Sequence, residues 1–329
     1  KEDYQEYSSM PSVYDSKYEL YFANTSGSSG EPFSFCKDKY CHSLAWAKNQ
    51  ISYYNLGISS IDKEARFFGN VRGSKGTQLY EFCKDVFLNR YRLNIFDNSE
   101  KNFIDYINLF KKNKFVYIYG YTNVILEFSK FLLSNKLNPL FNYCSTLKYC
   151  IVTAEMCSMQ DRAKIESAIG VPVYNEYGTS ETSIIAIEDK QFNWKISTDR
   201  LWIEILDEDN KPLKNGKSGK IVITDLFNKA FPFIRYEIGD IGSLEECNEF
   251  PYLLLKELSG RISDTIHLPS GKKSPGLSFY YVTRSIFEKS TNIREFKIIQ
   301  KDIDLFSFQI VSKQDLNEDE KKIIIDETE

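Results

Sequence analysis

Apolar residues in the first half of the chain follow two patterns that alternate along the sequence. Short runs of apolar residues, such as Phe115–Tyr119 and Leu147–Thr153, predict buried β-strands. The segments Thr122–Asn135 and Ser158–Ile169 instead place apolar residues three or four positions apart, which predicts helices with one buried face. Because strands that alternate with helices favour parallel strand–helix–strand units, we predict an α/β region over about residues 20–183.

The same patterns predict more elements around these four. Strands are predicted at 20–23, 65–69 and 171–174, and helices at 37–55, 78–90 and 99–112. Gly57 suits the C-cap of the first helix, and Ser158 with Asp161 has the spacing of a capping box. Ser99 is a candidate N-cap for the helix at 99–112, whose buried side should hold Phe103, Ile104, Ile107 and Phe110.

The pattern changes after residue 184. The runs Ile184–Glu188, Leu201–Leu206 and Lys220–Thr224 predict strands joined by polar turns, and therefore a β-rich, antiparallel subdomain over about residues 184–260. A helix at 278–289, strands at 296–300 and 306–311 and a charged helical tail at 314–329 predict a small α+β domain. We expect a mixed α/β fold with a large domain at 1–262, opened by a polar surface arm at 1–19, and a small domain at 263–329.

Composition excludes several classes of function. The net charge of −4 gives no basic surplus, so we expect no nucleic-acid partner. Seven cysteines without a CxxC pair fit reduced thiols in the cytoplasm. With His42 and His267 as the only histidines, we expect no histidine-based metal site. No run approaches about 18 apolar residues and no secretory leader opens the sequence, so we expect a cytoplasmic protein without a membrane span.

The stretch Thr25-Ser-Gly-Ser-Ser-Gly-Glu-Pro32 is the first candidate for chemistry. It follows a predicted strand and precedes a predicted helix. Glycines without a Cβ let backbone N–H groups close around an anion, and the hydroxyls add donors, which suits a triphosphate. A flexible Gly/Ser linker fits the same residues, and no Gly-Lys-Ser/Thr follows to make a Walker loop.

Three further stretches carry polar groups in tight turns. In 173–181 an aromatic ring could stack on a purine and a carboxylate could hold Mg²⁺, although an ordinary strand and turn would look similar. In 232–242, Asp240 could hold two sugar hydroxyls or only bond its own backbone. In 258–264, Arg261 could pair with a phosphate or a hydroxyl, or belong to a solvated hairpin.

In this order and at these separations, the four stretches resemble the signatures of the adenylate-forming ligase superfamily. Within it they are similar to the phenylacetate–CoA ligase branch and its capsular-polysaccharide-biosynthesis relatives. Thr25–Pro32 resembles the Thr-Ser-Gly-Ser/Thr-Thr-Gly-x-Pro phosphate loop, and Asn175–Glu181 resembles Tyr-Gly-x-Ser/Thr-Glu. Pro232–Asp240 resembles Pro-x-Ile-Arg-Tyr-x-x-Gly-Asp, and Gly260–Asp264 resembles the family's hinge. The likeness runs from about residue 20 to 312.

The resemblance implies a role for each matching residue. Tyr177 would stack on adenine beside Asn175 or Glu176, with Gly178 in the turn. Ser180 would touch the α-phosphate and Glu181 would hold Mg²⁺, so these two are the candidate catalytic residues. Asp240, assisted by Arg261, would hold the ribose, and Asp264 would be the pivot of a mobile C-terminal domain. The phosphate loop would consist of Thr25, Ser26, Gly27, Ser28, Ser29 and Gly30.

The resemblance also implies an acyl pocket, although aromatic runs often belong to a plain core. Its candidate residues come from three segments that end predicted strands: Phe68, Tyr119, Tyr121, Ala154 and Glu155. The implied reaction is ATP-dependent activation of a carboxylic acid to an acyl-adenylate, followed by transfer to a nucleophile, with CoA as the expected acceptor. Alternatives are transfer to an amine in surface-polysaccharide assembly, a binding-only member, or a generic α/β domain with chance motifs.

The chain departs from the family in three places. Only 24 residues precede the phosphate loop, and Phe33 stands where many relatives have a lysine. Relatives also place a catalytic lysine near the end of the small domain. Lys321 and Lys322 lie in a charged tail and receive no such role, so we expect that lysine to be absent from these residues.

Overall fold

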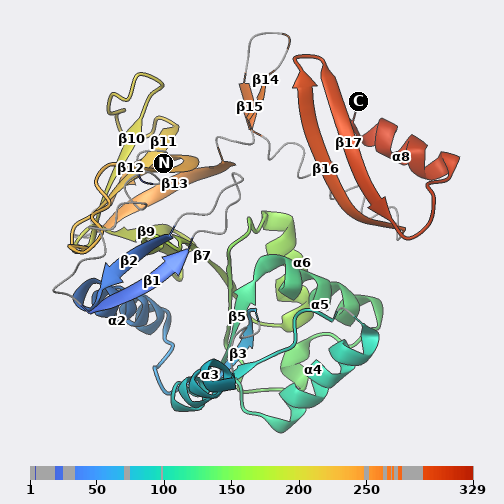
Figure 1. Ribbon diagram of the computed structural model, residues 1–329. Helices are drawn as coiled ribbons and strands as arrows, with labels where there is room; N and C mark the ends of the chain where they lie inside the picture. The colour runs from blue at the N-terminus through green and yellow to red at the C-terminus, as the bar shows by residue number, and fades with distance from the viewer. Residues whose placement is uncertain are drawn as a thin grey trace. The chain divides into compact units, whose positions relative to one another are not determined.

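A computed structural model describes residue 4 and residues 19–24, 34–69, 75–97, 99–247, 252–261, 265–267, 269, 273–275 and 292–328 (Figure 1). The chain divides into two compact units. Unit 1 contains 1–202, 223–236 and 245–255, and unit 2 contains 203–222, 237–244 and 256–329. The predicted joint near 261–264 lies largely outside the described residues and stays a prediction.

Unit 1 is built on a mixed sheet. Its parallel part has the order β4-β3-β5-β6-β7, and the sheet continues through β8 and β9, which pair antiparallel. The predicted change from parallel to antiparallel strands is therefore confirmed. The strands are β3 (Glu64–Phe67), β4 (Arg90–Arg92), β5 (Tyr117–Tyr121), β6 (Tyr149–Thr153), β7 (Val173–Thr179), β8 (Ser183–Glu188) and β9 (Trp194–Ser197).

Successive residues of a strand point to opposite faces of the sheet, so a strand with both sets buried must be covered on both sides. Helices cover both faces of the parallel strands. Ile118, Cys150 and Val173 enter the larger core, on the face covered by α4 (Glu100–Lys112), α5 (Thr122–Ser134) and α6 (Met159–Ile169). Their neighbours Tyr117, Ile151 and Tyr174 pack with Leu56 of α2 (Lys39–Leu56) on the opposite face. Unit 1 also contains α3 (Lys75–Phe87) and the hairpin of β1 (Leu20–Asn24) and β2 (Ser34–Asp38).

Local sequence signals set several helix ends as predicted. Ser99 accepts a hydrogen bond from the Asn102 backbone N–H, and Ser158 with Asp161 forms a capping box. Gly57 ends α2 with a left-handed backbone (φ +99°), which glycine adopts without strain.

Several details of the predicted elements are wrong. The helix predicted at 78–90 is α3 at Lys75–Phe87, and Arg90 belongs to strand β4. α2 begins at Lys39, because Asp38 caps it, and Lys37 belongs to strand β2. Strand β5 lies two residues later than predicted, at Tyr117–Tyr121. Ile104 is 42% exposed, and Tyr106 takes its place in the core of α4, where its ring packs edge-on against Phe67.

Unit 2 contains most of β10 (Leu201–Leu206), β11 (Gly219–Asp225) and β12 (Tyr236–Glu246), and the second part of β13 (Tyr252–Arg261). It also contains the hairpin of β14 (Thr265–His267) with β15 (Lys273–Pro275). β16 (Ile293–Asp302) pairs with β17 (Leu305–Ser312) and is followed by α8 (Glu318–Thr328), which confirms the predicted strands and tail helix. The helix predicted at 278–289 falls outside the described residues, and none of the described helices is long and apolar enough to cross a bilayer.

Candidate functional site

The Gly/Ser-rich stretch connects two strands that pair with each other. Residues Asn24 and Ser34 face each other at the end of the β1–β2 ladder, and the Ser34 hydroxyl donates to Oδ1 of Asn24 at 2.7 Å. A linker joins elements that stand apart, so this pairing favours a loop that leaves and returns at one place. The predicted phosphate-binding residues Thr25, Ser26, Gly27, Ser28, Ser29 and Gly30 themselves lie outside the described residues.

The chain enters a buried strand where this loop ends. Phe35 and Cys36 of β2 are completely buried, and the Cys36 carbonyl accepts a hydrogen bond from the Asn228 side chain at 3.0 Å. Asp38, at the end of the strand, accepts from the backbone N–H groups of Cys41 and Lys229, each at 2.9 Å. The C-terminal end of the loop is therefore attached to a fixed part of unit 1.

The second signature forms the tight turn between β7 and β8. Thr179 pairs with Ser183, so Ser180, Glu181 and Thr182 occupy the tip of the turn. The Thr182 N–H donates to the Thr179 hydroxyl oxygen at 3.1 Å. A Cβ on Gly178 would lie 2.6 Å from the Ser183 carbonyl oxygen, so the close approach of the two strands requires glycine there.

Two signatures meet at Glu181. The carboxylate is buried, at 8% exposure, and its Oε1 accepts a hydrogen bond from the Tyr236 hydroxyl at 2.8 Å. Tyr236 belongs to the Pro232–Asp240 stretch, where sequence reasoning gave it no role. Its ring also packs edge-on against Tyr4, 5.0 Å between centroids, so at Tyr4 the predicted surface arm is packed against this stretch.

Two buried cations hold the same turn. Lys37 donates to the Ser180 carbonyl at 3.1 Å and to the Ser183 hydroxyl at 2.8 Å. Burial lowers the pKa of the Lys37 ammonium to about 8. Arg200 donates to the carbonyls of Thr182 and Ile184, while it pairs with the buried Asp225 at 3.3 Å.

Sequence reasoning missed both cations. One local signal could have identified Lys37. It is a lysine within a short apolar run directly after the loop, between Phe35-Cys36 and the capping residue Asp38. Arg200 has no comparable local signal, because its partners lie 16, 18 and 25 residues away along the chain.

The predicted adenine-binding residues lie along β7. The backbone and side-chain N–H groups of Asn175 donate to Oε2 of Glu188 at 2.7 and 3.1 Å. Glu176 accepts from the hydroxyls of Tyr53 at 2.7 Å and Tyr119 at 3.0 Å, and burial raises the pKa of its carboxyl group. Tyr177 is half-buried, and its ring packs edge-on against Trp194.

The structure gathers the predicted acyl-pocket segments at the carboxyl ends of parallel strands, where ligands bind in open α/β sheets. Phe67 pairs with Gly120 and Tyr121 pairs with Thr153, so the ends of β3, β5 and β6 are neighbours. The ring of Phe68 stacks on Tyr121 with 4.3 Å between centroids, and on Tyr119 with 5.8 Å. The Arg66 guanidinium lies 5.0 Å from the Phe68 ring, a cation that the sequence had not singled out.

Ala154 and Glu155 complete this group. The Thr122 hydroxyl donates to the carbonyls of Thr153 at 3.3 Å and Glu155 at 3.0 Å, which ties the start of α5 to the end of β6. Ala154 between them has φ +72°, a conformation that costs energy outside glycine and often marks functional sites.

The remaining predicted residues lie further along the chain. Asp240 is half-buried in β12 within unit 2, four residues after Tyr236. Arg261 ends β13, but its side chain and the whole of Asp264 lie outside the described residues. Their roles stay predictions.

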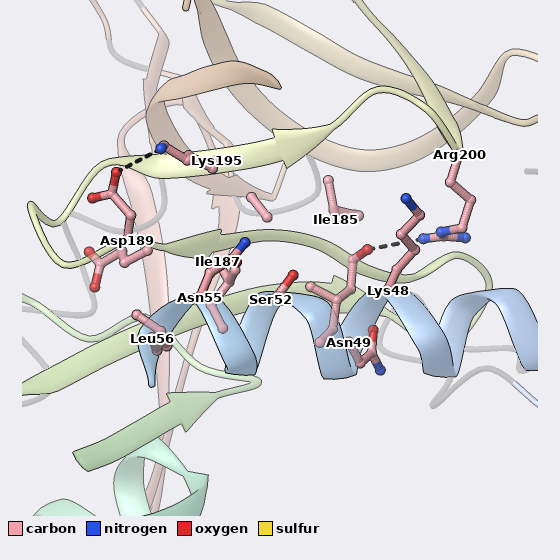
Figure 2. Close-up of a pocket in the computed structure, with 13 residues that line it drawn as sticks. Lys48, Asn49, Ser52, Asn55, Leu56, Ile185, Ile187, Asp189, Lys195 and Arg200 are labelled. Carbon is pink, nitrogen blue, oxygen red and sulfur yellow. Dashed lines mark hydrogen bonds and ion pairs between the residues drawn. The ribbon is translucent and has the colours of Figure 1, made fainter. Parts of the chain in front are cut away.

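A separate cavity of about 60 Å³ lies between α2 and strands β8 and β9 (Figure 2). Its wall includes Arg200 at one end and Lys195, which pairs with Asp189 at 3.4 Å, at the other. None of the predicted site residues that the structure describes lines this cavity. A second hollow, of about 480 Å³ beside Lys39, Tyr40 and Phe227, contains none of them either.

Similarities to known proteins agree with this arrangement. No protein-family model matches the chain. It is 25% identical over 310 residues to Protein CapK of Staphylococcus aureus, covering 91% of this chain and 65% of CapK. It is 34% identical over 110 residues to a phenylacetate-coenzyme A ligase of Thermus thermophilus, covering 31% of this chain and 24% of that enzyme.

The fold is also that of a solved ligase. The crystal structure of 2-hydroxyisobutyryl-CoA ligase in the postadenylation state, in complex with R3-HIB-AMP, superposes with a TM-score of 0.65 at 19% identity. The match covers 88% of this chain and 61% of that one, so the chain spans less than two thirds of these proteins. Together the similarities support the mixed α/β fold and the resemblance to the adenylate-forming ligase superfamily.

Proposed function

We propose that the protein binds Mg²⁺·ATP and activates a carboxylic acid as an acyl-adenylate, releasing pyrophosphate. The acyl group then passes to an acceptor thiol, for which CoA is the expected compound. The 2-hydroxyisobutyryl-CoA ligase of the same fold is in complex with an acyl-AMP, which supports the adenylate step.

One observation carries the proposal. The carboxylate of Glu181 and the hydroxyl of Tyr236 come from two signatures that lie 55 residues apart in sequence, and they are hydrogen-bonded at 2.8 Å. Chance likeness to two unrelated motifs gives no reason for their side chains to meet. Their contact argues against a generic α/β domain.

In this proposal the chain positions ATP and stabilises charge without forming a covalent intermediate. The half-buried ring of Tyr177 would stack on adenine, and the exposed Ser180 would donate to the α-phosphate. Asp240 would accept from the ribose hydroxyls, and the loop at Thr25–Gly30 would surround the outer phosphates. Asp264 would be the pivot on which a mobile C-terminal domain turns.

Glu181 fits a magnesium ion that arrives with the nucleotide. Among the described residues, no cluster of three His, Cys, Asp or Glu side chains could hold a metal by itself. Mg²⁺ bound with a nucleotide needs only one or two carboxylates, since phosphates and water supply its other ligands. Tyr236 engages Oε1 of Glu181, which orients the carboxylate for such a role. The ion would neutralise charge on the phosphates.

The acid would bind beside Phe68, Tyr119 and Tyr121. Their rings stack on one another at the strand ends, beside the Arg66 guanidinium, and their faces would pack against the acyl or aryl part of a substrate. Ala154 and Glu155 would border the pocket next to the reacting carboxylate. The identity of the acid depends on pocket shape, because one methylene changes selectivity by only about 1–3 kcal/mol.

The test measures pyrophosphate release from Mg²⁺·ATP with a panel of aliphatic and aromatic acids, followed by product analysis with CoA or with amino sugars. We expect release that depends on one class of acid and a thioester when CoA is present. An amide product would show that the acceptor is an amine and not CoA. ATP binding without release for any acid, in a protein extended to the length of its relatives, would identify a binding-only member.

The assigned residues are tested in the same assay. Glu181→Gln should slow pyrophosphate release by about 100-fold or more, because a charge at the reacting phosphates contributes about 3–4 kcal/mol. Asp240→Ala removes the proposed ribose ligand and should slow release at low ATP about 10- to 100-fold, because hydrogen bonds to a charged group contribute roughly 1.5–3 kcal/mol. Lys211→Met changes an exposed lysine in a polar turn and serves as the control. Unchanged release in both site variants would contradict the site assignment.

A further inference from the structure

Lys37 is a buried cation that the proposed reaction does not yet use. Its side chain lies in β2, a strand buried throughout its last four residues, and the residue is 7% exposed. Its ammonium donates only to neutral oxygens among its recorded hydrogen bonds, the Ser180 carbonyl and the Ser183 hydroxyl. A buried charge costs stability unless a compensating interaction is present, so a fold that needed only a donor here would be served by a neutral group.

The position of Lys37 connects two parts of the candidate site. It lies four residues after the loop that ends at Phe33, and it holds the turn that carries Ser180 and Glu181. Ser183, its second partner, has φ +61°, so the ammonium bonds the turn at a strained residue.

We infer that Lys37 is a positioning residue for the polyphosphate end of Mg²⁺·ATP. It holds the Ser180–Ser183 turn in the shape that presents Ser180 and Glu181, and its positive charge favours an anionic ligand at that turn. This inference rests on the proposed function, and it assigns Lys37 no contact with the reacting atoms.

The surroundings of Lys37 support a retained charge. Four groups interact with it electrostatically: Cys41 of α2, Arg200, Asp225 of β11 and Glu181 of the turn. Burial raises the pKa of the Cys41 thiol to about 12, so this neighbour is a neutral thiol at neutral pH. The described set then holds two cations and two carboxylates, and loss of the Lys37 charge would leave the turn beside a net negative charge.

The experiment compares binding of Mg²⁺·ATP and of adenosine by calorimetry at pH 7, for the wild type and Lys37→Met. We expect the dissociation constant for Mg²⁺·ATP to rise about 10- to 100-fold, the usual cost of removing a hydrogen bond from a charged group, while that for adenosine stays unchanged. A general loss of structure would weaken the binding of both ligands. Lys130→Met removes a lysine of α5 that pairs with Glu127 on the same helix and should leave both constants unchanged.

Two further variants keep the inference testable if Lys37→Met folds poorly. Lys37→Arg retains the charge and the donors and should recover most of the ATP affinity. Ser183→Ala removes one of the two oxygens that accept hydrogen bonds from Lys37, and it should weaken ATP binding less than Lys37→Met does. If folded Lys37→Met binds ATP as tightly as the wild type, or loses equal affinity for ATP and adenosine, the inference about Lys37 is overturned. The proposed function would be unaffected by that result. If the wild type binds no ATP, the proposed function fails and the inference fails with it.

Discussion

The Tyr236 hydroxyl donates to Oε1 of Glu181 at 2.8 Å, with both residues buried. Tyr236 begins β12, the strand that carries Asp240 four residues later. The orientation of the proposed magnesium ligand therefore depends on a residue from a second signature.

Tyr236→Phe should weaken Mg²⁺·ATP binding about tenfold, since a hydrogen bond to a carboxylate contributes roughly 1.5–3 kcal/mol and the ring remains to fill the space. Titration calorimetry with and without Mg²⁺ measures the effect, which should vanish without the ion. Tyr106→Phe also removes a buried tyrosine hydroxyl, one that donates to the Asn94 carbonyl, and should leave ATP affinity intact. An equal loss in both variants would mean that Tyr236 acts only on folding.

Tyr177→Ala should lower ATP affinity about 10- to 100-fold, because base–aromatic stacking contributes roughly 1–3 kcal/mol. Tyr177→Phe keeps the ring and should bind ATP nearly as well as the wild type. Fluorescence titration with an adenine nucleotide analogue distinguishes the two. If both variants bind equally, the adenine lies elsewhere.

The free energy of unfolding of the wild type should rise, relative to that of Lys37→Met, as pH increases from 8 to about 10.5. Burial lowers the Lys37 pKa from 10.5 to about 8, so in this interval the unfolded chain keeps a proton that the folded chain has lost. The unfolded state then binds more protons, and stability increases with pH. The total change should approach about 3 kcal/mol, because the pKa falls from 10.5 to about 8 and each unit corresponds to about 1.4 kcal/mol.

Urea unfolding at half-unit pH intervals measures this difference. Because every other titrating group is shared by the two proteins, the difference curve reports on Lys37. A flat curve between pH 8 and 10.5 would mean that Lys37 keeps an ordinary pKa.

Gly120→Ala should destabilise the protein by about 1–3 kcal/mol or more, as overpacking does in a dense core. A Cβ at Gly120 would lie 2.1 Å from the Phe67 carbonyl oxygen, and backbone cannot move aside as a flexible side chain can. Gly69→Ala is the matched control at the same edge of the sheet, because among the described residues its new Cβ would meet only the Tyr121 hydroxyl, at 4.0 Å. Thermal unfolding compares the two, and equal melting temperatures would contradict the close approach of β3 and β5.

Local features of this fold were predictable from sequence because local interactions cause them. Ser158 caps a helix through a residue three positions away, and Gly57 ends a helix through its own backbone freedom. Ile104 and Tyr106 show the limit of such patterns. Both fit an apolar face, but Tyr106 is the one whose ring meets Phe67 and whose hydroxyl reaches the Asn94 carbonyl.

The candidate site divides in the same way. Glu181, Tyr177 and Asp240 were found because they stand in short motifs. Lys37 and Arg200 were not, because their partners are distant in sequence: Lys37 bonds to Ser180, 143 residues away. The apolar run Phe35–Asp38 marks Lys37 as unusual, but only the folded chain shows which groups Lys37 contacts.

The pairing of Asn24 with Ser34 has a consequence for ligand capture. The two residues that flank the predicted phosphate loop are therefore held together before any ligand arrives. Ordering a chain segment costs about 1–2 kcal/mol per residue, and bringing its ends together is a separate expense that this hairpin has already met. A nucleotide bound at the predicted loop would therefore not have to supply the free energy of bringing these two ends together.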